Sequence, residues 1–212
     1  VFPYSVPEGK SGQQVVDQLQ KQVELLGAIK AGNFLVDCET YMSSPNNATQ
    51  RTVHILHNSE QPATCFSVLD TGTILVADLL YEDMMSKLTA TMATKTGRDS
   101  FFSQRKGFKI ESRGQRYEWG DFIIKIGSVS LQTNFKGILV EVEYCPCVVP
   151  NDCWGIIKEI SQTLIGMVAD SPPGALKNKM DSIFTPSDTI YQYLEHFNNF
   201  RKSAATTLQP NR

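Results

Sequence analysis

The stretch KIESRGQRYEWGDF, residues 109–122, decides the predicted fold because it combines a strand pattern with a turn signal. Apolar and charged side chains are interleaved in it, which is typical of a strand with one buried face. Gly114-Gln115 suits the two-residue type II′ loop of a β-hairpin, which prefers glycine at its first central position. We therefore predict two antiparallel strands that meet at this turn.

The predicted hairpin gathers charged side chains on one face. It places Arg113 opposite Arg116, and it places Glu111 opposite Glu118, so that each glutamate has an arginine as its diagonal neighbour. The other face carries the apolar side chains Phe108, Ile110, Tyr117 and Trp119. The charged face contains no nucleophile, no histidine and no set of metal ligands. We therefore predict a partner-binding surface formed by Glu111, Arg113, Arg116 and Glu118.

The second strand of the hairpin contains a change of parity. Apolar side chains occupy odd positions up to Trp119 and even positions from Phe122 onward. A β-bulge at Gly120-Asp121 would restore one continuous buried face, because a bulge inserts a single extra residue into a strand. We therefore predict a bulge at this position.

The rest of the chain supplies short strand patterns and a few helices. Ser11 and Gln14 form a capping box that begins an amphipathic helix, which ends near Gly27. Further strands are expected over residues 31–39, 51–58, 63–70, 73–77, 128–132 and 138–144, and a helix over 82–93. Two more helices are expected, one capped by Asp152 and reaching 164, and one capped by Ser187 or Asp188 and reaching 200. This pattern predicts an α+β protein with flanking helices and a single antiparallel β-barrel of about eight strands, or a strongly curled sheet in its place. We expect one domain over residues 1–202 and a disordered tail over 203–212.

Composition narrows the classes of function. The chain has 212 residues, a net charge of −2 and a sequence pI near 5.9, so we expect no direct sequence-specific nucleic-acid binding. No apolar stretch approaches the roughly 18 residues of a membrane span, so we expect no membrane association. The beginning of the chain lacks the pattern of a secretory signal. Five scattered cysteines, an odd number, favour a reducing compartment over a disulfide framework.

Three local motifs resemble sites only in part. Gly9-Lys10-Ser11 imitates the end of a phosphate-binding loop, but Tyr4 stands where the first glycine is needed. Cys145, Cys147 and Cys153 resemble half of a zinc site, which wants four ligands. His54 and His57 would lie on opposite faces of a strand and cannot share a ligand. We therefore predict no cofactor, no metal ion and no catalytic residues.

One pattern supports an enzymatic alternative. Charges stand two apart on four predicted strands, as Asp37 and Glu39, Glu111 and Arg113, Arg116 and Glu118, and Glu141 and Glu143. If these faces turned inward, the barrel could work as a metal-dependent phosphohydrolase of the triphosphate-tunnel type. We favour a solvated outer face, because burying unpaired charges is costly and the alternating apolar residues can form a core.

Several segments, in the same order along nearly the whole chain, resemble the family of subunit 20 of the Mediator complex. They are FLVDCETY at 34–41, HNSE at 57–60 followed by Pro62, KIESRG at 109–114 followed by Arg116-Tyr117, VEVEY at 140–144, PCVV at 146–149 and DCW at 152–154. A C-terminal pattern from Asp188 to Lys202 agrees as well. The resemblance does not extend to residues 94–105 and 169–179.

This resemblance implies a nuclear, non-enzymatic subunit of the Mediator head module. Members of the family are β-barrels with flanking helices that pair with subunit 18, a related barrel. A helix of subunit 8 tethers that partner to the rest of the head, and the assembly relays signals from activators to RNA polymerase II. We therefore expect a heterodimer in a transcription coactivator. The charged hairpin and the C-terminal helix are the surfaces that we expect to contact partners.

Overall fold

The computed structural model describes residues 1–43, 50–90, 102–105, 107–166 and 170–206. Nine strands form one antiparallel sheet in the order β1-β9-β8-β7-β2-β3-β4-β5, and β6 pairs with one end of β2. The strands are β1 (Phe2–Tyr4), β2 (Ile29–Ser43), β3 (Thr52–Asn58), β4 (Thr64–Leu69), β5 (Ile74–Asp78), β6 (Phe102–Gln104), β7 (Ile110–Trp119), β8 (Phe122–Leu131) and β9 (Asn134–Tyr144). The helices are α1 (Gly12–Leu25), α2 (Leu80–Ala90), α3 (Pro150–Ile165), a 3₁₀ helix η2 (Gly174–Lys179) and α4 (Pro186–Thr206).

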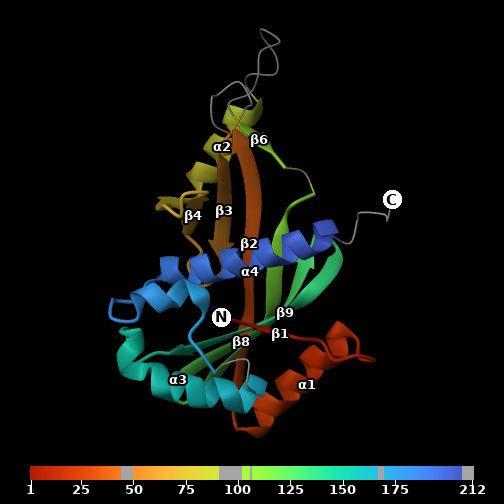
Figure 1. Cartoon of the computed structure of the whole chain (residues 1–212), viewed down its shortest axis with the longest axis vertical. Helices are drawn as coiled ribbons and strands as arrows, with labels where there is room; N and C mark the ends of the chain where they lie inside the picture. Colours follow the sequence, from red (N-terminus) through yellow and green to blue (C-terminus); the bar gives the residue numbers. More distant parts are fainter. Residues whose placement is uncertain (44–49, 91–101, 106, 167–169, 207–212) are drawn as a thin grey trace.

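The α+β class and the large antiparallel sheet agree with the sequence prediction, but barrel closure is not confirmed. The strand order is open, and its two ends, β1 and β5, do not pair with each other. Helix α4 instead lies across the strands (Figure 1) and buries Ile190, Tyr193 and Phe197 against them. A helix laid on the sheet covers the apolar surface that a closed barrel would enclose.

Both faces of the sheet are covered. On one face, α1 packs Val15, Leu19 and Val23 against even-numbered residues of β8 and β9, while α2 packs Met85 against β2, β3 and β4. On the other face, α4 packs against residues of β2, β3, β4, β7, β8 and β9. Alternating residues of the central strands are therefore buried in turn on opposite faces.

The predicted hairpin at Gly114 is wrong. Strand β7 runs without interruption through Gly114, which pairs with Phe34 of β2 and Gly127 of β8. A Cβ atom on Gly114 would lie 1.8 Å from the carbonyl oxygen of Ile126, so this glycine permits close strand packing instead of a turn.

The chain reverses at Gly120-Asp121, where a bulge was predicted. Trp119 pairs directly with Phe122, which leaves a two-residue hairpin loop between β7 and β8. Gly120 has φ of 55°, in the left-handed region that favours glycine and that the first position of a type II′ loop requires. The change of parity in the sequence therefore marks the turn itself, and the predicted bulge is wrong.

One helix start agrees with the sequence, and three differ, since α2 begins at Leu80 instead of residue 82 and two more helices also begin early. The capping box of α1 is confirmed, since Ser11 Oγ accepts from the Gln14 amide and Gln14 Oε1 accepts from the Ser11 amide. Helices α3 and α4 begin at Pro150 and Pro186, which precede the predicted caps Asp152 and Ser187 or Asp188. Proline suits the first helical position because its missing amide hydrogen would be unpaired there anyway.

Some predictions concern residues that the structure describes only in part. Helix α4 extends to Thr206, so residues 203–206 of the expected tail are helical, and 207–212 lie outside the described residues. The single domain over 1–202 stays a prediction. Most of 94–105 is likewise outside the description, apart from β6 and its neighbour Arg105. Within the described part of the chain, no helix is both long and apolar enough to cross a membrane.

Candidate functional site

The four residues predicted to share one charged face lie in β7 but divide between the two faces of the sheet. Because β7 is continuous, its side chains alternate. Glu111 and Arg113 lie on the face of α1 and α2, and Arg113 Nη2 is 3.5 Å from Glu111 Oε1. Arg116 and Glu118 lie on the face of α4, with Arg116 Nη1 2.7 Å from Glu118 Oε1. The single charged face is therefore wrong, and partner binding by these four residues stays a prediction.

Arg116 belongs to a network of charges on the α4 face. Its Nε lies 3.4 Å from Glu60 Oε2, and Glu60 Oε2 lies 3.9 Å from the Nζ of Lys125. Arg116 pairs with Lys125 across the β7–β8 ladder, so two cations would stand side by side without the glutamates. Glu60, from the turn between β3 and β4, therefore bridges the two cations.

The centre of this network is a buried ion pair. Lys125 Nζ lies 2.9 Å from Glu141 Oε1, and the two side chains are only 3% and 7% exposed. Tyr193 of α4 donates its hydroxyl to the other Glu141 oxygen at 2.7 Å, and its pKa is raised well above its usual value by burial and by the Glu141 carboxylate. Glu141 is therefore not on a solvated outer face as predicted, because α4 covers it. A single lysine inside the apolar run FIIKIG, residues 122–127, was the sequence signal for this site.

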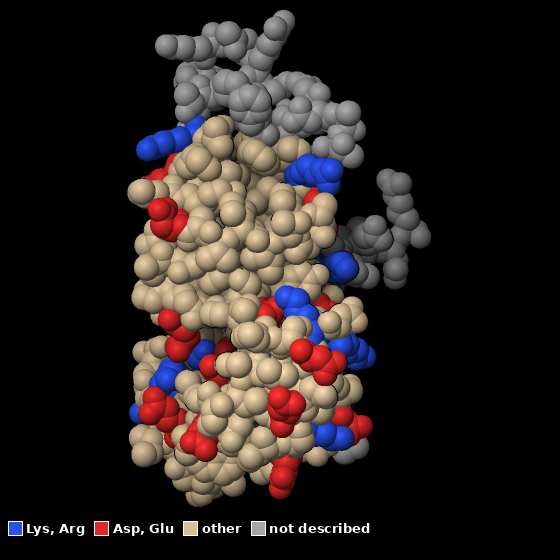
Figure 2. Space-filling view, turned by 90° about the vertical axis from the view of Figure 1, so that its left-hand side faces the viewer, with Lys and Arg blue, Asp and Glu red and all other residues tan. Residues whose placement is uncertain are grey.

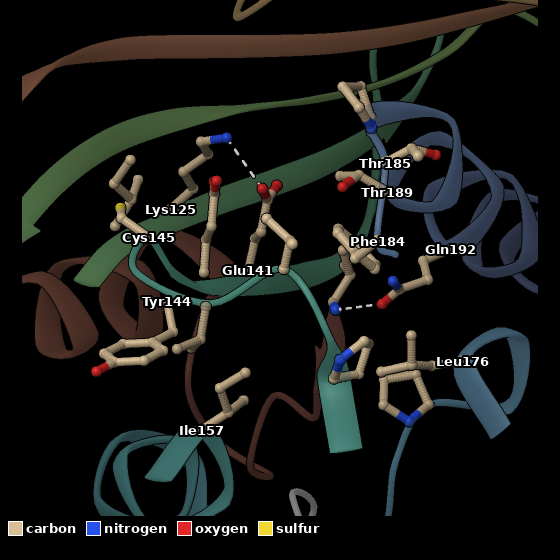
Figure 3. A pocket seen from close by; sticks show the side chains of 18 of the residues that line it. Lys125, Glu141, Tyr144, Cys145, Ile157, Leu176, Phe184, Thr185, Thr189 and Gln192 are labelled. Carbon is tan, nitrogen blue, oxygen red and sulfur yellow. Dashed lines mark hydrogen bonds and ion pairs between the residues drawn. The ribbon is translucent and has the colours of Figure 1, made fainter. Parts of the chain in front are cut away.

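A cavity of about 300 Å³ opens beside the ion pair. Figure 3 shows Lys125 and Glu141 on the sheet side of this cavity, Ile157 of α3 across from them, and Thr189 and Gln192 of α4 at one end. Gln192 Oε1 accepts a hydrogen bond from the nitrogen of Val1 at 2.7 Å, which ties the beginning of β1 to α4. The cavity is therefore bounded by the sheet, α3 and α4.

The polar groups of this cavity already have partners in the chain, which limits their capacity to bind a ligand or a metal ion. Both Glu141 oxygens are engaged, one by Lys125 and the other by Tyr193. Among the described residues, no three His, Cys, Asp or Glu side chains are placed to hold a metal ion together. Partial burial at the rim of the cavity and the charges of Glu141 and Glu60 raise the pKa of Glu143. The geometry suits a structural network better than a reacting centre.

The cysteines near the cavity occupy a corner between β9 and α3. Cys147 Sγ and Cys153 Sγ both donate to the carbonyl oxygen of Val149, at 3.4 and 3.5 Å. Burial raises the pKa of the Cys153 thiol to about 11, which favours a protonated, unreactive sulfur. Cys145 is exposed at the end of β9. Cys147 and Cys153 are therefore held in a strand-to-helix corner by backbone contacts.

A second charged network lies on the face of α1 and α2. Lys109 Nζ is 3.4 Å from Asp37 Oδ2 and 3.1 Å from Glu39 Oε1, and His57 Nδ1 is 3.2 Å from Asp37 Oδ1. Glu111 of β7 pairs with Asp37 of β2 in the ladder and lies on the same face. Together with Arg113 on the same face, these residues form a charged strip. The strip lies between the apolar cluster under α1 and the apolar cluster under α2.

We expect the two histidines of β3, His54 and His57, to have widely separated pKa values. Burial lowers the pKa of His54 to about 4, while the hydrogen bond that the His57 ring donates to the Asp37 carboxylate raises the pKa of His57 to about 10. Relative to an unfolded value near 6.5, His57 contributes stability below pH 6.5 that is lost toward pH 10. The contribution of His54 is present above pH 6.5 and lost as the pH falls toward 4. We expect an NMR titration to show His57 charged and His54 neutral at pH 6.5, and two ordinary titrations near that pH would contradict these environments.

Two solved structures show a low similarity to this chain. One is a protein from Pyrococcus horikoshii OT3, with a TM-score of 0.42 at 11% identity over 77% of this chain and 87% of that one. The other is a putative adenylyl cyclase from Hippeastrum described as having a dominant triphosphatase activity, with a TM-score of 0.42 at 12% identity over 77% of this chain and 86% of that one. Likeness at this level carries no conclusion about function.

Sequence relatives are much closer. Residues 1–198 match the family model described as "TATA-binding related factor (TRF) of subunit 20 of Mediator complex". The Mediator of RNA polymerase II transcription subunit 20 of Anopheles gambiae is 49% identical over 213 residues, which cover 94% of this chain and 92% of that protein. The human protein of the same name is 41% identical over 202 residues, which cover 93% and 91%. The chain therefore belongs to the Mediator subunit 20 family, whose members take part in transcription as subunits of the Mediator complex.

Proposed function

We propose that the chain is a non-catalytic subunit of the Mediator head module that acts in the nucleus. In this proposal it forms a heterodimer with subunit 18 and, through that partner, joins subunit 8 and the machinery of RNA polymerase II. Family membership supports a role in the Mediator complex. The rigid construction of the sheet supports a scaffold, because helices are fixed to both of its faces.

The observation that carries the non-catalytic part of the proposal is the engagement of Glu141. A phosphohydrolase of the triphosphate-tunnel type needs carboxylates free to hold a divalent cation and basic groups free to hold phosphate. Here Lys125 and Glu141 neutralise each other at 2.9 Å, and Tyr193 takes the remaining carboxylate oxygen at 2.7 Å. These contacts attach α4 to the sheet, so the charged residues have a structural role.

Co-expression with subunits 18 and 8, followed by a mass measurement of the purified assembly, tests the proposal. We expect one copy of this chain in a complex with subunit 18, and recovery of this chain alone would overturn the heterodimer. Incubation of the complex with manganese and nucleoside triphosphates addresses the enzymatic alternative. Turnover that is lost on Glu141→Gln would replace the scaffold proposal with a catalytic one.

Two members of the predicted partner surface are well exposed, Arg113 on the charged strip and Glu118 on the face of α4. The side chain of Arg113 is 66% exposed, whereas that of Arg116 is 18% exposed and engaged by Glu60 and Glu118. We expect Arg113→Ala to weaken assembly with subunit 18 by roughly 3- to 10-fold, mainly through slower association, since rim charges act on encounter rates. The measurement is the association rate at low and high salt.

A variant of the other β7 arginine separates binding from folding. Arg116→Ala removes two contacts to glutamates, so we expect it to lower the thermal stability of the chain. We expect its effect on the association rate with subunit 18 to be smaller than that of Arg113→Ala. If Arg113→Ala leaves the association rate and its salt dependence unchanged, the charged strip does not contact subunit 18.

A further inference from the structure

The free edge of β5 differs from the rest of the sheet surface. β5 is the last strand in the order, and no described strand pairs with its outer side. Apolar side chains are exposed along and beside it, with Leu75 51%, Val76 56%, Leu79 48% and Leu80 70% exposed. The side of the molecule with β4, β5 and α2 shows a broad area free of Lys, Arg, Asp and Glu (Figure 2). The edge therefore combines an unpaired backbone with an apolar surface.

The hydrogen-bonding alternation of the ladder identifies the backbone groups that point outward. The Leu69 amide donates to the Thr73 carbonyl at 3.0 Å, so this pair is a hydrogen-bonded one. Hydrogen-bonded and non-hydrogen-bonded pairs alternate in an antiparallel ladder. The pair Phe66–Val76 is the third pair after Leu69–Thr73, so it is a non-hydrogen-bonded pair. By this alternation Ile74, Val76 and Asp78 direct their amides and carbonyls to the free edge.

The opposite edge of the sheet is built differently. β1 has only three residues and carries Pro3 at its centre, which removes a donor from the edge. Natural sheets protect edges by short strands, proline and charged side chains, especially lysine. β5 has the sequence ILVAD, in which no proline or lysine interrupts the outward-facing backbone. One edge of the sheet is therefore protected, and the other is open to pairing.

The charges around β5 indicate the chemistry of its partner. Residues 52–86 contain no Lys or Arg and five acidic residues. Of these, Asp78 and Asp83 form no ion pair with a described residue, and both are exposed. A second copy of this chain would bring the same acidic segment against itself, which like charges disfavour. A strand with apolar side chains and basic flanks matches this edge instead.

We propose that β5 receives an extended strand from another Mediator head subunit, which continues the sheet in trans. Backbone hydrogen bonds from Ile74, Val76 and Asp78 give the pairing, and apolar side chains of the added strand cover Leu75 and Val76 on the two faces. Basic residues that flank the added strand lie near Asp78 and Asp83. This inference rests on the proposed function, because it requires membership in the head module.

Proline at position 76 tests the pairing with little change to the chain itself. The Val76 amide points away from β4, so Val76→Pro removes a donor from the edge but no bond of the β4–β5 ladder. We expect incorporation into a reconstituted head module to weaken by about 10- to 100-fold, because a partner carbonyl is left unpaired and the ring obstructs its approach. Val76→Thr keeps the amide and the size of the side chain, and it should assemble as the unchanged chain does.

Hydrogen exchange of the unchanged chain gives a second readout that does not depend on a variant. We expect the segment 73–79 to exchange slowly in the head module and quickly in the free chain. If the segment exchanges equally in both and Val76→Pro assembles normally, the β5 proposal is overturned while the proposed function stands. If the unchanged chain does not assemble at all, both fail. A homodimer of the free chain that Val76→Pro disrupts would replace the head subunit by a second copy.

Discussion

Replacement of Lys125 by methionine is expected to lower the free energy of unfolding by about 3 to 5 kcal/mol, the usual cost of removing one partner from a buried ion pair. Methionine approximates the volume of the lysine stem, so the loss of unfolding free energy is due more to removal of the charge than to a change in packing. The Glu141 carboxylate would remain covered by α4, with the Tyr193 hydroxyl as its remaining close partner. Chemical unfolding in urea, monitored by circular dichroism, measures the change.

Two further variants show whether the ion pair is the cause. Lys30→Met removes an exposed lysine from β2 of the same sheet, and it should change stability by no more than about 0.5 kcal/mol. A combined Lys125→Met, Glu141→Met and Tyr193→Phe chain removes both members of the buried ion pair together with the hydroxyl that donates to it. We expect it to recover most of the lost stability, because replacing a whole buried polar set costs far less than orphaning one member. A combined chain as unstable as Lys125→Met alone would mean that packing, not charge, determines the loss.

The strands of the central sheet could be predicted from the sequence, but the direction in which their side chains point could not. Alternation of apolar and polar residues located β3, β4, β5 and β9 within a few positions. It also suggested one buried face, so Glu141 was assigned to solvent. Helices on both sides of the sheet bury both alternating sets, and a local pattern does not contain the position of a distant helix such as α4.

The prediction of the candidate site was wrong for the same reason, because the local sequence does not show in which direction the side chains point. Glu111, Arg113, Arg116 and Glu118 were placed on one face because a turn at Gly114 would fold the strand back on itself. A glycine that permits a turn and a glycine that permits close approach of a neighbouring strand look the same in a single sequence. The true turn, Gly120-Asp121, carried an equally good signal, and the change of parity after Trp119 was explained by a bulge instead. Only the pairing of β7 with β2 on one side and β8 on the other distinguishes the two cases.

Substitution of Gly114 by alanine is the direct test of that distinction. In the type II′ turn predicted from the sequence, alanine at Gly114 would cost about 1 to 2 kcal/mol, because that position requires a positive φ. In the structure Gly114 has no positive φ, so this source of strain is absent. In the continuous strand, the added Cβ meets the Ile126 carbonyl oxygen at 1.8 Å and the Gly127 Cα at 2.7 Å. Both neighbours are backbone atoms that cannot rotate away, so β7 and β8 must separate locally. We expect a loss of about 3 kcal/mol, at the upper end of overpacking costs.

Gly155 provides the matched control for this substitution. It lies within α3, and a Cβ atom there would meet nothing within 4 Å. Gly155→Ala is therefore expected to stabilise the chain by roughly 0.5 to 1 kcal/mol, because alanine loses less backbone entropy in a helix. Thermal melts of the two variants should shift in opposite directions from the unchanged protein. Equal small shifts would mean that β7 and β8 do not approach each other closely at Gly114, and the register of the central sheet would then have to be reassigned.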